Sequence, residues 1–264
     1  MKTIKFFLSL IAFMALTFSL PAQSSEQPWY IVDYMKTKPG MASKYLECEK
    51  AWKTIHAERV KQGIIAGWEL FQVRFPAGSN AEYDFATVTT LKGGWPAIGK
   101  LDASWNTDYT KVVPKDKMPL VENTGSYRDL VKTEVHALQD AAFAPENKPF
   151  KYIMVNYFDV PDGRWDEYAA METKLVKPVH QLDIDAGKRV GWLLDAIAIP
   201  TAHDTYDAVT VDLYENWNDV GGGGGEDAWK KAHPGMSQEY ITRQIEGARK
   251  MVKQEMWVLL DNIQ

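Results

Sequence analysis

The chain has 264 residues, of which 45% are hydrophobic, and it carries a formal net charge of −5 at pH 7. This acidic balance excludes binding of nucleic acid through the phosphate backbone, which needs a basic face. A single cysteine, Cys48, excludes an internal disulfide framework, and the scattered histidines lack metal-ligand spacing, so no metal site is expected.

The first 24 residues are typical of a secretory signal peptide. Two lysines precede an apolar stretch from Phe6 to Leu20, and Ala22 and Ser24 supply the small side chains that a signal peptidase prefers. The apolar stretch is shorter than a comfortable membrane span, and no later run is long enough to cross a membrane. We therefore expect cleavage near residues 22–24 and a mature protein that is periplasmic or secreted.

After residue 24 the chain repeats itself once. The tripeptide VDY at 32–34 matches VNY at 155–157, an offset of 123 residues (155 − 32). A period of about 120 residues is far longer than one solenoid unit, so each copy is expected to form a domain with its own core. We predict a first domain at 25–140, a linker at 141–150 and a second domain at 151–264. Later matches have an offset of 124 (177 − 53): Lys53, His56, Gly63, Gly67 and Trp68 match Lys177, His180, Gly187, Gly191 and Trp192.

Both copies predict the same order of elements. An aromatic and β-branched run predicts a first strand, and helical spacing follows up to Gly63 or Gly187, glycines suited to a left-handed C-terminal cap. Two strands joined by a hairpin, a longer polar helical region and a last strand complete each copy. In the first copy these segments are strand 29–35, helix 41–62 and strands 67–75, 83–91 and 134–139. In the second they are strand 151–158, helix 164–186 and strands 191–199, 206–214 and 255–260.

The resulting order, β-α-β-β-α-β, is that of a ferredoxin-like α+β unit, an antiparallel sheet with both helices on one face. The other face of such a sheet is left bare, and two copies in one chain can cover each other. Within the long helix the offset changes by one residue between Glu172 and Lys177, and Pro178 follows. An inserted residue beside a proline predicts a kink or a π-bulge at this point.

The segments VDYMKTKPG at 32–40 and YDFATVTTLKGGW at 83–95 give the chain a resemblance to the dimeric α/β-barrel superfamily, closest to its antibiotic-biosynthesis-monooxygenase-like and NIPSNAP-like members. The resemblance implies two tandem ferredoxin-like domains packed sheet to sheet as an intrachain pseudo-dimeric barrel around a central cavity. It also implies a range of activities, because such relatives include cofactor-free oxygenases, haem-degrading monooxygenases, isomerases and members with no known activity.

The candidate catalytic residues lie on one face of the first helix of each copy. Residues three or four apart share a helix face, so a carboxylate and a lysine stand beside a histidine whose pKa and tautomer they are able to tune. The competing interpretation is a solvated, salt-bridged helix face. The residues are Glu49, Lys53 and His56 in the first copy and Glu172, Lys177 and His180 in the second.

The candidate ligand-binding residues lie on the strands. Asp33 and Asn156 are polar positions in apolar first strands, typical of a ligand site if they face the cavity. Tyr34 and Tyr157 take the opposite face, and the alternation leaves open which pair points inward. The remaining candidates are aromatic residues that open later strands, for which core packing is the alternative: Trp68, Trp192, Tyr83 and Tyr206.

The resemblance also places His233 roughly where haem-degrading relatives carry an iron-ligating histidine. Pro234 follows it and the first copy has no matching histidine, so a surface-loop residue is the favoured interpretation. No cofactor is expected, and haem is the alternative.

The sequence thus favours an exported barrel protein that binds a small apolar or aromatic molecule. The resemblance adds cofactor-independent oxygenation or isomerisation as its chemistry. A non-catalytic structural or partner-binding barrel is the second hypothesis, and a haem-binding or haem-degrading protein is the third. The pseudo-dimer leaves further oligomerisation open.

Overall fold

The computed structural model describes residues 27–145, 148–200 and 206–263, so the predicted signal peptide lies outside the described residues. The first half contains β1 (Pro28–Thr37), α1 (Ala42–Lys61), β2 (Gly67–Phe75), β3 (Phe85–Lys92), α2 (Trp95–Ser104), η1 (Tyr109–Lys111), α3 (Met118–Glu122), α4 (Thr124–Tyr127) and β4 (Arg128–Phe143). The second half contains β5 (Tyr152–Asp159), α5 (Trp165–Met171), η2 (Glu172–Val176), α6 (Lys177–Asp185), β6 (Gly191–Ile199), β7 (Ala208–Tyr214), η3 (Trp217–Asp219), α7 (Glu226–Ala232), α8 (Gln238–Ala248) and β8 (Lys250–Ile263).

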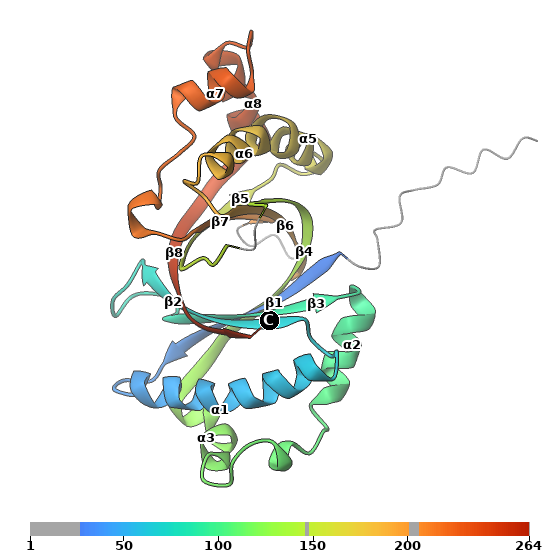
Figure 1. Ribbon diagram of the computed structural model, residues 1–264, viewed down its shortest axis with the longest axis vertical. Coiled ribbons are helices and arrows are strands. Elements are labelled where there is room, and N and C mark those ends of the chain that lie inside the picture. Colours follow the sequence, from blue (N-terminus) through green and yellow to red (C-terminus); the bar gives the residue numbers. More distant parts are fainter. Residues whose placement is uncertain (1–26, 146–147, 201–205, 264) are drawn as a thin grey trace, which may run out of the picture.

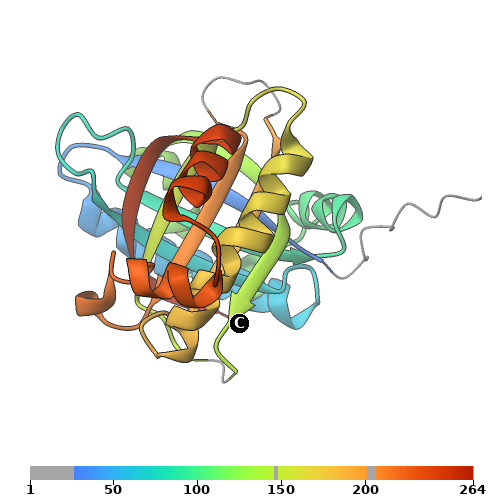
Figure 2. The ribbon, with the colours of Figure 1, turned by 90° about the horizontal axis from the view of Figure 1, so that it is seen from above.

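The strands close into one antiparallel barrel in the order β1-β3-β2-β8-β5-β7-β6-β4. Figure 1 shows the ring of strands with α1, α2 and α3 outside one half and α5 to α8 outside the other. Seen from above, α5 to α8 lie across the outer face of the second half (Figure 2). This mixed α/β fold with an eight-stranded barrel is compatible with the predicted ferredoxin-like dimeric α/β barrel.

The two halves share hydrogen-bonded strand edges as well as facing each other. Strand β4 pairs with both β1 and β6, and β8 pairs with both β5 and β2. Both strands are therefore longer than predicted, because each must span its own sheet and the neighbouring one. Strand β4 continues to Phe143, which pairs with Gly191, so the first three residues of the predicted linker are strand.

The long helices end as predicted. Helix α1 is followed by Gly63 at φ +66°, and α6 is followed by Gly187 at φ +71°, both in the left-handed region where a side chain is strained. The predicted irregularity is confirmed, because Glu172–Val176 forms a π-helical turn that takes up the extra residue.

This turn also corrects the expectation for His233. Its Nε2 lies 2.7 Å from the Leu175 carbonyl oxygen, and the side chain is only 8% exposed. A π-turn weakens the regular helix hydrogen bonding, and a histidine from the end of α7 satisfies one of its carbonyl groups. His233 is therefore a buried structural residue, where a surface-loop residue was expected.

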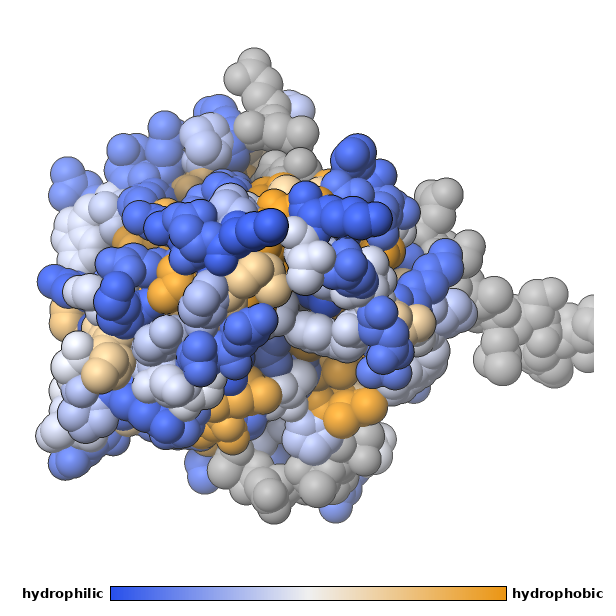
Figure 3. All heavy atoms as spheres, turned by 90° about the horizontal axis from the view of Figure 1, so that it is seen from below, coloured by the Kyte–Doolittle hydropathy of each residue, from blue (hydrophilic) through white to orange (hydrophobic). Residues whose placement is uncertain are grey.

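Three hydrophobic clusters make up most of the core. One fills part of the barrel interior, and the other two lie between the barrel and the helices of each half. The outer surface seen from below is largely hydrophilic, with apolar residues in small separate groups (Figure 3). No helix in the described ranges is long and apolar enough to cross a membrane.

Candidate functional site

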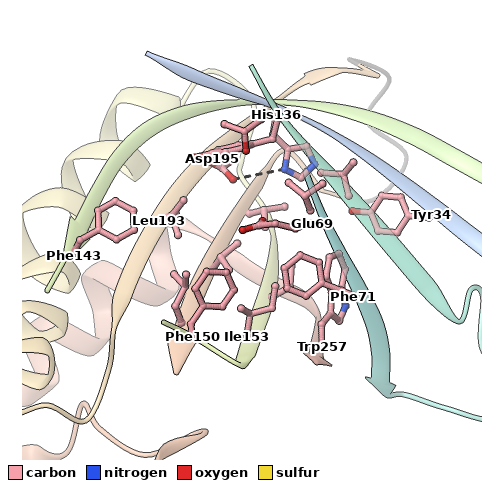
Figure 4. A pocket seen from close by; sticks show the side chains of 18 residues that line it. Tyr34, Glu69, Phe71, His136, Phe143, Phe150, Ile153, Leu193, Asp195 and Trp257 are labelled. Carbon is pink, nitrogen blue, oxygen red and sulfur yellow. Dashed lines mark ion pairs between the residues drawn. The ribbon is translucent and has the colours of Figure 1, made fainter. Parts of the chain in front are cut away.

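A cavity of about 250 Å³ lies inside the barrel. Its walls come from strands of both halves, and most of the lining side chains are apolar. Figure 4 shows His136, Asp195 and Glu69 gathered on one side, with Phe71 and Trp257 among the apolar groups opposite. A largely apolar cavity with a few convergent polar groups is the usual composition of a small-molecule site.

One end of the barrel interior carries a buried network of tyrosine, glutamate and lysine side chains. Tyr34 donates to Glu134 (2.8 Å) and lies 3.5 Å from the hydroxyl of Tyr157, which donates to Glu255 (3.1 Å). The network is reciprocal between the halves, because Tyr83 of the first half donates to Glu255 while Tyr206 of the second donates to Glu134. The lysines complete it: Lys132 donates to Tyr206 (2.6 Å) and Lys253 donates to Tyr83 (2.7 Å).

The repeat in the sequence pairs these residues: Tyr34 with Tyr157, Tyr83 with Tyr206, Lys132 with Lys253 and Glu134 with Glu255. Every buried hydroxyl and carboxylate of this network has a partner, and it adjoins the cavity at Tyr34. A fully bonded buried network rigidifies a core. We therefore interpret it as a structural network that closes the cavity on one side.

The cavity itself is not symmetric. Five polar residues on its lining have apolar counterparts at the matching repeat positions, and these counterparts line the same cavity. The polar members are Tyr30, Glu69, Thr90, His136 and Asp195, and their counterparts are Ile153, Leu193, Leu213, Trp257 and Phe71. The two halves therefore build one polar wall and one apolar wall, and hence a single site in the barrel.

His136 is the charged centre of the polar wall. Its Nε2 lies 3.2 Å from Glu134, and its Nδ1 lies 3.7 Å from Asp195, an ion pair longer than a hydrogen bond. Burial alone lowers the pKa of His136, but the carboxylates of Asp195 and Glu134 outweigh it and raise the pKa to about 9. At neutral pH the ring is therefore an imidazolium ion, with each nitrogen facing a carboxylate.

Glu69 also lines the cavity, but no described residue stabilises its charge as an ion-pair partner. Its carboxylate has no hydrogen-bonding or ion-pair partner in the part of the chain that the structure describes, and burial raises its pKa to about 7. Tyr30 also lines the cavity with a hydroxyl that bonds no described residue. Burial, and then the charges of Asp195 and Glu69, raise the pKa of Tyr30, so the phenol stays protonated.

The predicted catalytic residues lie outside the cavity and take separate partners. Lys53 pairs with Asp261 (2.5 Å), and Lys177 pairs with Asp140 (2.6 Å), so each lysine joins its helix to the long strand of the other half. His56 stacks on Trp68 at 5.1 Å. Burial, and then Arg59, lower the pKa of His56 to about 3, so this ring is neutral.

The second copy shows the same arrangement. His180 stacks on Trp192 at 5.3 Å, and burial lowers the pKa of His180 to about 2. Glu172 pairs with Arg249, and the matching carboxyl of Glu49 is also buried, with a pKa that burial raises to about 7. The residues of the predicted face therefore stabilise the contact between helix and barrel. This geometry favours a structural role for them over a catalytic one.

Of the predicted ligand-binding residues, Tyr34 lines the cavity, and Tyr157, Tyr83 and Tyr206 belong to the adjoining network. The alternation of strand β1 turns Asp33 to the outer face, where it accepts from Thr133, and Asn156 likewise bonds Asp212 and Gln254. Trp68 and Trp192 pack between barrel and helices. The expectation that Asp33, Asn156, Trp68 and Trp192 line the cavity is thus wrong, because all four project from the opposite face of their strands.

The five polar cavity residues that have apolar counterparts were not predicted from the sequence. The available signal was the break in the repeat, since each is polar where the other copy is apolar. A search for residues that both copies share overlooks such positions. A site that is not symmetric between two repeats is formed by residues that differ between them.

Among the described residues, His136 on the cavity and His233 at the end of α7 do not fit a haem. His233 uses its Nε2 on a carbonyl group, and both nitrogens of His136 face carboxylates, so neither ring offers an available axial nitrogen. The cavity of about 250 Å³ also lies below the usual range for drug-sized ligands. No cluster of metal-ligating side chains occurs among the described residues.

In architecture the chain is thus a mixed α/β fold with a closed eight-stranded antiparallel barrel, compatible with a dimeric α/β barrel, and a polarised cavity lies inside it. By sequence, neither a protein family nor a curated protein matches it. Among solved structures, a proposed monooxygenase of Fusobacterium nucleatum superposes with a TM-score of 0.59 at 12% identity, over 90% of this chain and 94% of that one.

Two further structures are similar over comparable lengths. A proposed monooxygenase of Lactobacillus acidophilus has a TM-score of 0.48 at 12% identity, over 89% of this chain and 94% of its own. A haem-binding protein of Thermus thermophilus has a TM-score of 0.49 at 10% identity, over 89% and 92%. At 12% identity the Fusobacterium nucleatum structure shows likeness of fold alone, so the function has to be argued from the site.

Proposed function

We propose that this protein binds a small apolar or aromatic molecule with one polar group inside its barrel. The observation that carries the proposal is the cavity with an apolar wall and an opposite wall that holds Glu69 and the His136–Asp195 pair. A volume of about 250 Å³ corresponds to about eight water molecules at ~30 Å³ each, the scale of a one- or two-ring compound.

The distribution of charge determines the orientation of such a ligand. A polar group on the ligand compensates for the desolvation of Glu69, while its apolar part packs against Phe71 and Trp257. A ligand without any polar group leaves the carboxyl uncompensated, and it is therefore expected to bind more weakly.

We also infer that the barrel derives from a tandem duplication and forms within one chain what two chains form in a dimer. The repeat offsets and the reciprocal ion pairs of Lys53 and Lys177 support this inference. The apolar stretch at the N-terminus supports the further proposal that the protein is exported. N-terminal sequencing of the protein from its native cell envelope tests this, with residue 25 or a close neighbour expected as the first residue.

The binding proposal is tested by thermal denaturation with a panel of aromatic alcohols and ketones, such as 2-naphthol and 2-tetralone. A ligand at 100 times its Kd stabilises by about 2.7 kcal/mol, which raises the Tm of a chain of this size by roughly 5–10 °C. Leu193→Trp fills the cavity and is expected to abolish the shift. Leu260→Trp, at a partly exposed position on β8, is the matched control and should retain it.

A panel that produces no shift in the wild-type protein contradicts the proposal and favours the non-catalytic structural barrel. Titration with haemin tests the third hypothesis. We expect no Soret shift that depends on His233, because its Nε2–H already donates a hydrogen bond to the Leu175 carbonyl oxygen.

A further inference from the structure

Two groups on the polar wall have complementary chemistry and no partner. Glu69 presents a carboxyl and Tyr30 presents a phenol, and both line the cavity without a bond to any residue of the described ranges. They stand on β2 and β1, which are separated by β3. They do not bond each other, but the strand register places them on the same wall, since Tyr30 is opposite Thr90 on β3 and Thr90 is opposite Gly67, two residues before Glu69.

The surroundings give these two side chains different protonation states: above about pH 7 Glu69 is ionised while Tyr30 stays protonated. The polar groups around Glu69 and Tyr30 are Thr90 on β3 and His136 on β4, both opposite Tyr30 in the strand register, and Asp195 on β6, the strand beyond β4. The imidazolium of His136 is held between Glu134 and Asp195 and is not available as a base. Near neutral pH, Glu69 is therefore the proton acceptor and Tyr30 is the hydrogen-bond donor of the cavity.

The rest of the lining limits the reactions that the cavity is able to support. Among the described residues the lining contains no cysteine, serine or lysine to act as a nucleophile, and besides the polar wall, which includes the Thr90 hydroxyl, its side chains are mainly aliphatic and aromatic. A base, a phenol donor and an apolar enclosure are the components needed to remove a proton from carbon beside a carbonyl group, because the negative charge that develops on the carbonyl oxygen needs a donor in a water-poor site.

We propose that the cavity enolises a small apolar ketone, with Glu69 as the base and Tyr30 as the donor to the carbonyl oxygen. This inference rests on the proposed binding function and names its substrate class. The Glu69 carboxylate takes a proton from the carbon beside the carbonyl group, the C–H electron pair forms the carbon–carbon double bond, and the carbonyl π electrons move to the oxygen, which Tyr30 stabilises. The protonated Glu69 returns the proton to the same or a conjugated carbon, so the product is an isomer and no oxidant or reductant is consumed.

The chosen probe is 2-tetralone in D₂O, with loss of the proton signals beside its carbonyl group followed by NMR. We expect the wild-type protein to accelerate this exchange over buffer. Glu69→Gln is expected to bind the ketone, measured as a Tm shift, and to exchange it about 100-fold more slowly, the lower range for loss of a general base. Tyr30→Phe should also bind and lose about 100-fold, as expected for removal of an oxyanion donor.

Glu49→Gln provides the matched control. Glu49 is likewise a buried glutamate whose pKa is raised to about 7 by burial, but it lies between helix α1 and the barrel and away from the cavity. This variant should exchange 2-tetralone at the wild-type rate. If Glu69→Gln fails to fold, Glu69→Asp keeps the test, since a carboxylate withdrawn by one methylene should slow exchange while it retains the dependence on pH.

The outcomes separate the two proposals. Binding of 2-tetralone without exchange, or exchange that Glu69→Gln leaves unchanged, overturns the assignment of the base and leaves the binding function standing. If no compound of the panel binds the wild-type protein, both proposals fall, whereas binding of the alcohols without the ketones overturns the enolisation proposal alone. Binding with exchange that depends on Glu69 and Tyr30, and not on Glu49, supports both.

Discussion

Replacement of the buried His136–Asp195 pair is expected to change how the stability of the protein depends on pH. Removal of one partner alone leaves an unpaired buried charge, so the informative variant is the double substitution His136→Gln with Asp195→Asn, which removes both charges at similar volume. The pKa of His136 is about 9 in the folded protein because the carboxylates outweigh burial, and about 6.5 in an unfolded chain.

Because the folded pKa is raised, the protonated histidine stabilises the fold fully below pH 6.5, and this contribution is lost as the pH rises through 9. The difference between the two pKa values corresponds to about 3 kcal/mol at 1.36 kcal/mol per unit.

The assay is urea denaturation of the wild-type protein and the double variant at pH 6, 7.5 and 9.5, followed by tryptophan fluorescence. The wild-type free energy of unfolding, measured relative to the variant, should fall by about 3 kcal/mol from the lowest to the highest pH. A difference that stays constant with pH, or that grows as pH rises, would refute the protonated pair.

Three further predictions concern the caps, the ion pairs and the proposed base. Gly63→Ala and Gly187→Ala should each lower the free energy of unfolding by about 1 kcal/mol in thermal melts, because both positions have positive φ; unchanged stability would contradict the cap assignment. Lys53→Met should cost about 0.5 kcal/mol at low salt and less in 1 M NaCl, since the pair with Asp261 is about one third exposed; a salt-independent loss would point to packing instead. The exchange rate of 2-tetralone should rise tenfold per pH unit up to about pH 7 and then level off, as the pKa of Glu69 requires of a base; a rate that falls with rising pH contradicts this role.

Most of the fold was predictable because it depends on local periodicity. Glycines at helix ends, aromatic and β-branched strand segments and the order of the elements are all set by neighbours in the chain. The π-turn at Glu172–Val176 was predictable for a related reason, since a one-residue insertion inside a helix has few other solutions. The lengths of β4 and β8 were not, because they depend on pairing with strands of the other half.

The residues that line the cavity were not predictable from local sequence patterns. A strand alternates its faces, but the alternation does not say which face is inside, so Tyr34 and Asp33 were equivalent candidates. The helix-face lysines are a second example, because their partners, Asp261 and Asp140, lie on strands far away in sequence.

The sequence by itself determined the repeated β-α-β-β-α-β order and the helix ends of this protein, because these follow from periodicity and backbone preferences that act over a few residues. Only the tertiary structure decided which face of each strand lines the barrel, and that His136 and Asp195 meet on the neighbouring strands β4 and β6. Closure of the barrel joins strands distant in sequence, and the burial and charge that set the pKa values of Glu69 and His136 exist only after that closure.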